Sequence, residues 1–309
     1  MTELTKSTSV AGDATAPAKG ANAEAEPAIA RVTQWGEIRH RFLANKLAVV
    51  GLGLVLLLFL TAIFAPMLAP HDPYAQDLTN TLQDPGSGHL LGTDALGRDQ
   101  LSRIIYGTRI AVVIGLASIF LACLIGIVIG ALAGYFGRAT DSVLMRIADV
   151  FFAFPLLIGA IVIIIVMGRG VMPVIISLAI FSWPTVSRLL RSSILSVREA
   201  DYVLAARALG ADTRRIIVRH IIPNSIAAVM AYAAFSVGGA IVAEASLSFL
   251  GVGVSPEVPE WGNMLAAAKD FMGVKDFLWT YPSIAIVLTV LGFVFVGDGL
   301  RDALDPKLR

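Results

Sequence analysis

The sequence has very little cysteine and little charge. Its one cysteine, Cys123, excludes an intramolecular disulfide and any metal site built from several thiolates. Charged residues make up 15% of the 309 residues and hydrophobic residues 56%, whereas soluble domains carry roughly 25% charged residues. The net charge of +1 argues against a basic nucleic-acid-binding protein. The composition also excludes a disordered chain, a coiled coil and an ordinary soluble enzyme.

Motifs of known catalytic sites are missing as well. The sequence has no HExxH motif, no P-loop, no Gly-x-Ser-x-Gly motif and no pair of cysteines. An integral membrane enzyme would need catalytic side chains gathered at one membrane face. The four histidines, His40, His71, His89 and His220, are scattered along the chain. We therefore expect no catalytic residues and no metal site, although His71 and His89 share one predicted loop with five acids, which keeps a metal site there as an alternative.

What the sequence does contain is a set of long runs without charge. About 20 helical residues cross a bilayer core about 30 Å thick, and lipid forces such runs to satisfy their own backbone hydrogen bonds. We therefore predict an all-α integral membrane protein with six transmembrane helices. The predicted spans are 47–66, 110–136, 149–168, 170–188, 224–249 and 277–297.

Lysine and arginine are distributed unevenly between the segments that connect these runs. If the N-terminus is cytoplasmic, 18 of the 24 Lys and Arg residues fall on the cytoplasmic side. The positive-inside rule therefore predicts that both termini are cytoplasmic. Residues 1–30, rich in Ala and Thr, are predicted to be a disordered cytoplasmic tail, and residues 31–309 the membrane domain. Extracytoplasmic loops are expected at 67–109 and 251–276, and a cytoplasmic loop at 189–222.

Small residues and one cap are the clearest local features near the second span. Gly126, Gly130 and Gly134 recur every four residues, which predicts a face on which another helix packs closely, within the chain or between chains. Asp99 is expected to N-cap a short helix that starts at Gln100 and leads into the span.

Two acids border the apolar runs, Glu244 after the fifth and Asp298 after the sixth. An acid at mid-membrane would indicate a proton or ion relay. Because both residues stand near span ends, we expect them to be solvated. Glu244, Asp298 and the nearby Ser246 are the candidates for the pathway or its gate.

The cytoplasmic loop predicts a short helix followed by a turn. Ser196 and Glu199 fit a capping box for a helix over 197–209, with Gly210 where a left-handed residue ends a helix. Asp212 stands where a second helix would begin. The expected apolar stripe on the first helix consists of Val197, Ala200, Leu204 and Ala208. The loop therefore predicts a compact helical unit, with an ordinary positively charged loop as the alternative.

Several segments together form a specific pattern that runs from about Arg41 to Arg309. They are Leu91–Asp99, Leu101–Gly107, Ala133–Gly137, Asp201–Gly210, Arg219–Asn224, Glu244–Gly251 and Gly297–Pro306. In order and spacing this pattern resembles the C-type permease subunits of ABC importers for dipeptides, oligopeptides and nickel. The resemblance implies the type I ABC importer permease fold.

The resemblance also implies that the cytoplasmic loop docks a coupling helix into an ATPase subunit. The family's motif is Glu-Ala-Ala, three residues, Gly, nine residues, Ile-x-Leu-Pro. In this sequence Leu204 stands at the position of the Glu and His220 at that of the first Ile, which argues against a salt bridge from the motif's Glu. The coupling residues that the resemblance implies are Leu204, Ala205, Ala206, Gly210, His220 and Pro223, and Glu199 of the capping box is added to them.

A subunit of this kind would form half of a translocation pathway in the cytoplasmic membrane of a bacterium. The implied partners are a second homologous permease, two ATP-binding subunits, an extracytoplasmic substrate-binding protein and the lipid bilayer, and no nucleic acid. The chain itself needs no cofactor, because ATP and Mg²⁺ would bind to the partner subunits. Short peptides are the expected substrates, with nickel or glutathione-like compounds as alternatives. A stand-alone secondary transporter would need ionisable residues at mid-membrane or inverted repeats, and we find neither in the sequence.

Overall fold

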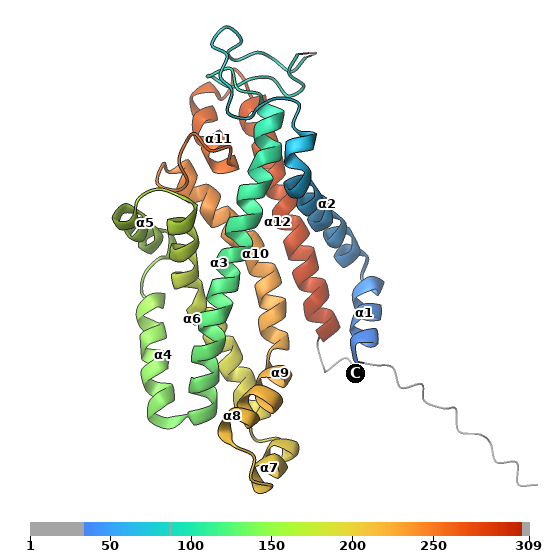
Figure 1. The fold of residues 1–309 in the computed structure, drawn as a ribbon, viewed down its shortest axis with the longest axis vertical. Helices are drawn as coiled ribbons and strands as arrows, with labels where there is room; N and C mark the ends of the chain where they lie inside the picture. The colour runs from blue at the N-terminus through green and yellow to red at the C-terminus, as the bar shows by residue number, and fades with distance from the viewer. Residues whose placement is uncertain (1–33, 87, 305–309) are drawn as a thin grey trace, which may run out of the picture.

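The structure, a computed structural model, describes residues 34–86 and 88–304. The predicted tail 1–30 and the last five residues lie outside this range. All regular elements of the described part are helical (Figure 1). The α-helices are α1 (Gln34–Ala44), α2 (Lys46–Leu68), α3 (Gln100–Phe136), α4 (Arg138–Phe152), α5 (Leu156–Met167), α6 (Val171–Val197), α7 (Asp201–Ala208), α8 (Thr213–Ile216), α9 (Ile222–Ser225), α10 (Ala227–Phe249), α11 (Trp261–Ala268) and α12 (Phe277–Leu304). A π-helical segment, Ile217–Ile221, joins α8 to α9, and a 3-10 turn, Lys269–Phe271, follows α11.

Five of these helices, α2, α3, α6, α10 and α12, are long and apolar enough to cross a membrane. A sixth crossing would have to be made by α4 and α5 together, which are bent by 86° relative to each other. The sequence of the described residues therefore supplies five or six spans.

The structure differs from the single straight helix predicted over 149–168. There α4 ends before Ala153, and α5 begins after Pro155. Proline has no backbone N–H and disfavours helical geometry in the residue before it, so the helix stops and the chain turns at this point. A run without charge does not reveal such a break.

The second span also differs from its prediction, because α3 is one continuous helix of 37 residues. The Asp99 side chain accepts a hydrogen bond from the Ser102 N–H (2.8 Å), which confirms the predicted N-cap. However, no separate short helix precedes the span, so residues 100–109 belong to α3 rather than to the predicted loop 67–109.

The core forms around α3, which runs the length of the bundle in Figure 1. α3 packs against α6, α10 and α2, while α12 packs against both α2 and α10. The main buried cluster takes side chains from several helices, including Ile114, Leu178, Ile241 and Phe293. Burial of such side chains against protein, with other apolar faces left for lipid, is the pattern of a membrane-embedded bundle.

The glycine face of α3 lies against α6 of the same chain. A Cβ atom on Gly126 would stand 2.6 Å from the Val186 Cβ, and one on Gly130 would stand 2.6 Å from the Ser187 carbonyl oxygen. At Gly134 the nearest atom is the Ile194 Cβ, at 2.9 Å. Because real Cβ atoms do not approach this closely, only glycine allows the two backbones to lie together here.

The bundle has two distinct ends (Figure 1). We call the end that carries α7, α8 and α9 the α7 end, and the opposite end, with α11 and the loop between α2 and α3, the α11 end. The loop and α11 are each joined to the start of α3. Arg103 Nη1 donates to the Pro73 carbonyl oxygen of the loop (3.0 Å), and Trp261 Nε1 of α11 donates to the Ile104 carbonyl oxygen (3.1 Å).

Candidate functional site

The α7 end carries the segment that the sequence predicts to be the coupling unit, but its helix starts later than predicted. α6 continues through Val197, so Ser196 lies in its last turn. The N-cap of α7 is Ala200, whose side chain offers no hydrogen-bond acceptor. The predicted capping box of Ser196 and Glu199 is therefore wrong. The physical reason is tertiary packing: Ile194 is fully buried and Val197 packs on the same cluster, which favours a longer α6.

A single buried side chain anchors α7. Val203 is fully buried in a cluster with Leu190 of α6 and Ile216 of α8, whereas Leu204 is 43% exposed. The predicted apolar stripe is therefore wrong at Leu204 and Ala208, which are both exposed, and Val203 is the buried residue of α7.

The predicted coupling residues of this unit are exposed or partly exposed to solvent. Gly210 has a φ of +80°, the left-handed conformation predicted for it, and no atom lies within 4 Å of where its Cβ would stand. His220 is partly exposed within the π-helical segment, and Pro223 is exposed in α9. The other predicted coupling residues are exposed or partly exposed: Glu199, Leu204, Ala205 and Ala206.

Two arginines of the α6 terminus tie this unit to the bundle. Arg198 Nη1 donates to the Gly134 carbonyl oxygen (2.9 Å) at the end of α3. The Arg191 guanidinium pairs with both carboxylate oxygens of Asp141 on α4. The position of the α6 terminus is therefore linked to two neighbouring helices.

The three pathway candidates do not form one cluster. Glu244 lies near the α11 end of α10 and is 1% exposed, so the expectation that it is solvated is wrong. Asp298 is exposed on α12, toward the α7 end. The Ser246 hydroxyl donates to the Val242 carbonyl oxygen of its own helix (2.7 Å).

Glu244 is buried because α11 covers it. Its carboxyl group lies against that of Glu260, and the Ser248 hydroxyl donates to Glu244 Oε1 (3.2 Å). Glu260 caps α11 by accepting from the Gly262 and Asn263 N–H groups (2.8 Å to Asn263). Burial raises the pKa of the Glu260 carboxyl, although these two backbone donors lower it in part. Sequence reasoning missed Glu260; an acid directly before Trp261 and a short apolar helix is the cap pattern that would have indicated it.

A buried ion-pair cluster lies close to this pair of acids. Arg98 Nε donates to Asp94 Oδ2 (2.7 Å), and Arg103 Nε lies 3.9 Å from the same oxygen. Arg103 is 1% exposed, and its Nη2 reaches the Val258 carbonyl oxygen (3.5 Å) in the segment before Glu260. The cluster fixes the loop between α2 and α3 against the α11 segment.

A cavity of about 420 Å³ opens between α6, α10 and α12. Its polar and aromatic lining consists of Tyr232, Phe235, Asp298 and Arg301. One acid, one base and two aromatic rings suit a small ligand that carries both charges.

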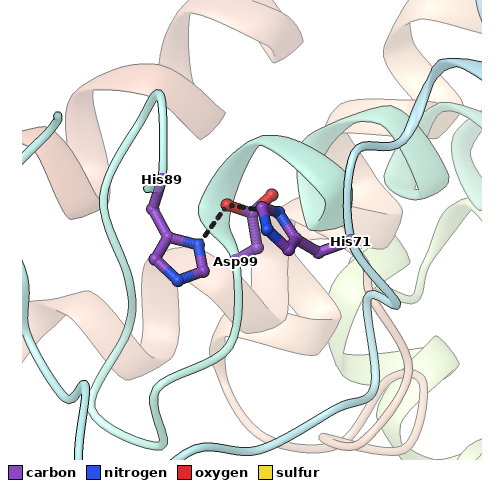
Figure 2. A group of neighbouring side chains, drawn as sticks. All are labelled: His71, His89 and Asp99. Atoms are coloured by element: carbon purple, nitrogen blue, oxygen red, sulfur yellow. Dashed lines mark hydrogen bonds and ion pairs between the residues drawn. The ribbon is translucent and has the colours of Figure 1, made fainter. Parts of the chain in front are cut away.

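The α11 end also brings together two histidines and a carboxylate, shown in Figure 2. His89 Nδ1 lies 2.8 Å from Asp99 Oδ1, and His71 Nδ1 lies 3.6 Å from the same oxygen. Burial alone would raise the pKa of the Asp99 carboxyl, but hydrogen bonds from Ser102 and His89 outweigh it and hold that pKa below its usual value. The sequence placed His71 and His89 in one loop without placing either against Asp99.

A helical bundle of this kind, with five or six apolar spans and a small exposed helical unit at one end, defines a polytopic membrane protein. Residues 126–309 match the family described as binding-protein-dependent transport system inner membrane component, and residues 33–85 match the N-terminal transmembrane domain of oligopeptide transport permease C. The chain therefore belongs to this family of transport permeases, and it is a multi-pass protein of the cytoplasmic membrane.

Relatives of known name cover nearly the whole chain. The glutathione transport system permease protein GsiD of Pectobacterium atrosepticum is 43% identical over 90% of this chain and 92% of its own length. The dipeptide transport system permease protein DppC of Alkalihalophilus pseudofirmus is 40% identical over 90% and 91%. The oligopeptide transport system permease protein OppC of Bacillus subtilis is 40% identical over 89% and 90%.

A solved structure is similar in fold. A chain of the inward-facing MetNI methionine ABC transporter aligns with 66% of this chain and 96% of its own length, with a TM-score of 0.54 and 18% sequence identity. Over the aligned part, the helical arrangement described above is thus similar to that of a chain of this ABC transporter.

Proposed function

We propose that this chain forms half of the translocation pathway of an ATP-driven importer of short peptides. The observation that carries the proposal is the match to named peptide and glutathione permeases over about nine-tenths of the chain. The second half would be a homologous permease. Two ATP-binding subunits and an extracytoplasmic substrate-binding protein would complete the assembly.

The orientation that supports this proposal places the α7 end in the cytoplasm, where ATP is. The segment 188–220 carries seven of the 18 positive charges assigned to the cytoplasmic side. Both described chain ends, at α1 and α12, would then be cytoplasmic, and α11 would face the substrate-binding protein.

α7 would transmit the movement of an ATPase subunit to the membrane. The exposed Leu204 and Ala205 and the partly exposed Ala206 offer a surface on which Leu204 is the one large side chain. Val203 holds α7 to α6 and α8. ATP and Mg²⁺ would bind only to the partner subunits, so this chain would couple but not catalyse.

A short peptide is the substrate that the cavity supports. Asp298 and Arg301 would face the two charged termini of a zwitterion, and Tyr232 and Phe235 would pack on its side chains. Glutathione is the second candidate, because the GsiD relative at 43% identity is named for it. It is also a short peptide, so the same cavity chemistry suits it; nickel remains the third.

Reconstitution with the partner subunits tests the proposal. The chain, its second permease, the ATPase subunits and the binding protein would be placed in vesicles with ATP inside the compartment that contacts α7. We expect uptake of a labelled dipeptide that requires ATP and the binding protein, with unlabelled glutathione as competitor to rank the two substrates. Uptake by the chain alone, driven by an ion gradient, would favour the secondary transporter instead.

A further inference from the structure

Three side chains of the types that can bind metal ions come from three separate segments to one point at the α11 end (Figure 2). His71 follows α2, His89 lies in the loop between α2 and α3, and Asp99 caps α3. One donor atom from each lies within 4.8 Å of the others. Neither the cavity nor the coupling unit uses these residues.

We propose that His71, His89 and Asp99 bind one divalent transition-metal ion, of the class of Zn²⁺, Co²⁺ or Ni²⁺. Two imidazole nitrogens and one carboxylate oxygen form a set that these ions favour, whereas Mg²⁺ and Ca²⁺ prefer oxygen ligands throughout. Three protein ligands leave at least one coordination position for water.

The distances fit such an ion with little adjustment. Metal–ligand bonds of about 2.0–2.2 Å at angles near 90–110° separate neighbouring ligand atoms by about 3.0–3.5 Å. The two measured separations from Asp99 Oδ1, 2.8 Å to His89 Nδ1 and 3.6 Å to His71 Nδ1, lie on either side of that range. The rings already approach each other, with centroids 4.6 Å apart.

The residues around the cluster hold its carboxylate in place. The Ser102 N–H and hydroxyl both donate to Asp99 Oδ2, at 2.8 and 2.7 Å, which turns Oδ1 toward the histidines. The Ser102 hydroxyl also accepts from the His71 N–H (3.0 Å), so the same side chain positions two ligands. Such outer contacts orient the ligands of known metal sites.

The three side chains are also placed so that an ion can reach them from solvent. The Asp99 side chain is 1% exposed, and that of His71 is 43% exposed, so an ion would reach a fixed carboxylate from the solvent side through a movable histidine. The bound ion would join the exit of α2, the middle of the loop and the start of α3.

Metal titration of the purified full chain tests this proposal, with an affinity tag that contains no histidine. After treatment with a chelator, the chain would be titrated with Co²⁺, followed by absorption spectroscopy, and with Zn²⁺, followed by calorimetry. We expect one ion per chain. His71→Ala and His89→Ala should each weaken binding by about tenfold or more, the scale of losing a group that supports a metal site. Asp99→Asn should do the same while keeping a side-chain oxygen to cap α3.

His40→Ala and His220→Ala are the matched controls, since both residues lie outside the α11 end, in α1 and the π-helical segment. They should leave the affinity unchanged. The absence of binding to the unaltered chain would overturn the proposal. So would binding that survives the combined replacement of His71 and His89, which would mean that these histidines serve only as hydrogen-bond partners of Asp99.

Discussion

Replacing Gly130 with alanine should destabilise the protein, although alanine is the better helix former. The added Cβ would stand 2.6 Å from the Ser187 carbonyl oxygen and 3.1 Å from the Ser187 Cα on α6. Both are backbone atoms, so no side-chain rotation relieves the contact. The two helices must separate, and the packing of the fully buried Leu190 and Ile194 must change with them.

Two opposing free-energy contributions, helix propensity and overpacking, set the size of the destabilisation. Alanine favours a helix over glycine by about 1 kcal/mol. Overpacking a tight contact costs about 1–3 kcal/mol. The van der Waals separation of carbon and oxygen is about 3.3 Å, so the backbones must move apart by about half an ångström or more. The net change should therefore be a loss of up to about 2 kcal/mol in the free energy of unfolding.

Thermal unfolding of the purified chain in detergent measures this loss. Each kcal/mol shifts the unfolding temperature by about 2–4 °C in chains of 150–250 residues, so we expect about 2 °C for each kcal/mol in this longer chain of 309 residues. Gly53→Ala is the matched control, because no atom lies within 4 Å of its Cβ position on α2. It should unfold at the same temperature as the original chain or slightly above. Gly134→Ala should fall between the two, since its nearest contact is 2.9 Å and involves a side chain. If Gly130→Ala were as stable as Gly53→Ala, the close α3–α6 contact would be refuted.

Three further predictions concern the two ends of the bundle. Gly210→Val should insert normally but transport less. Strain of about 1 kcal/mol at a φ of +80° should reduce the population of the native loop conformation about fivefold. Gly210→Asn should retain transport in the same uptake assay, because asparagine tolerates positive φ. Burial raises the pKa of the Glu260 carboxyl beside Glu244, so the folded state keeps a proton that the unfolded state releases above its ordinary pKa of 4.5. The unfolding temperature should therefore fall as pH rises through the raised pKa, and Glu260→Gln should remove that part of the dependence. A reporter active only outside the cytoplasm should work when fused after Asp270 and stay silent after Ala211; the reverse pattern would invert the proposed orientation.

Local rules predicted the features that depend on one or two residues. Asp99 caps α3 as expected, because the acceptor and the N–H it satisfies are three residues apart in the chain. Gly210 adopts positive φ, and α8 begins directly after Asp212. In each case the favourable conformation is decided within one helical turn.

Where prediction and structure differ, a local conformational preference competes with the burial of side chains in the tertiary structure. Ser196 and Glu199 suit the start of a helix, but burial of Ile194 in the α6 cluster outweighs a cap worth about 1 kcal/mol. In the segment around Pro155, the absence of charge concealed the residue that breaks the helix. Proline alone would not have predicted that break, because Pro184 lies inside the continuous helix α6.

Contacts between distant segments were beyond local reasoning. Glu244 has an apolar neighbourhood in sequence, and only the position of α11 shows that Glu260 meets it. His71 and His89 meet at Asp99 because the loop folds back onto the start of α3. Such meetings depend on the path of the whole loop, which no periodicity in the sequence encodes.

The helix α7 is held by fewer buried contacts than the α11 end, and the proposed coupling depends on that difference. At the α11 end, Arg103, Glu260 and Trp261 are buried and hydrogen-bonded, so that end is fixed by packing. At the other end, Val203 is the buried residue of α7. Between them, the glycine contacts bring α3 and α6 together at backbone distance. Because close-packed interiors transmit displacement rather than absorb it, a push on α7 would pass into the membrane as a movement of α6 together with α3. Coupling would therefore require the stiffness supplied at Gly130 as well as the exposed surface of α7.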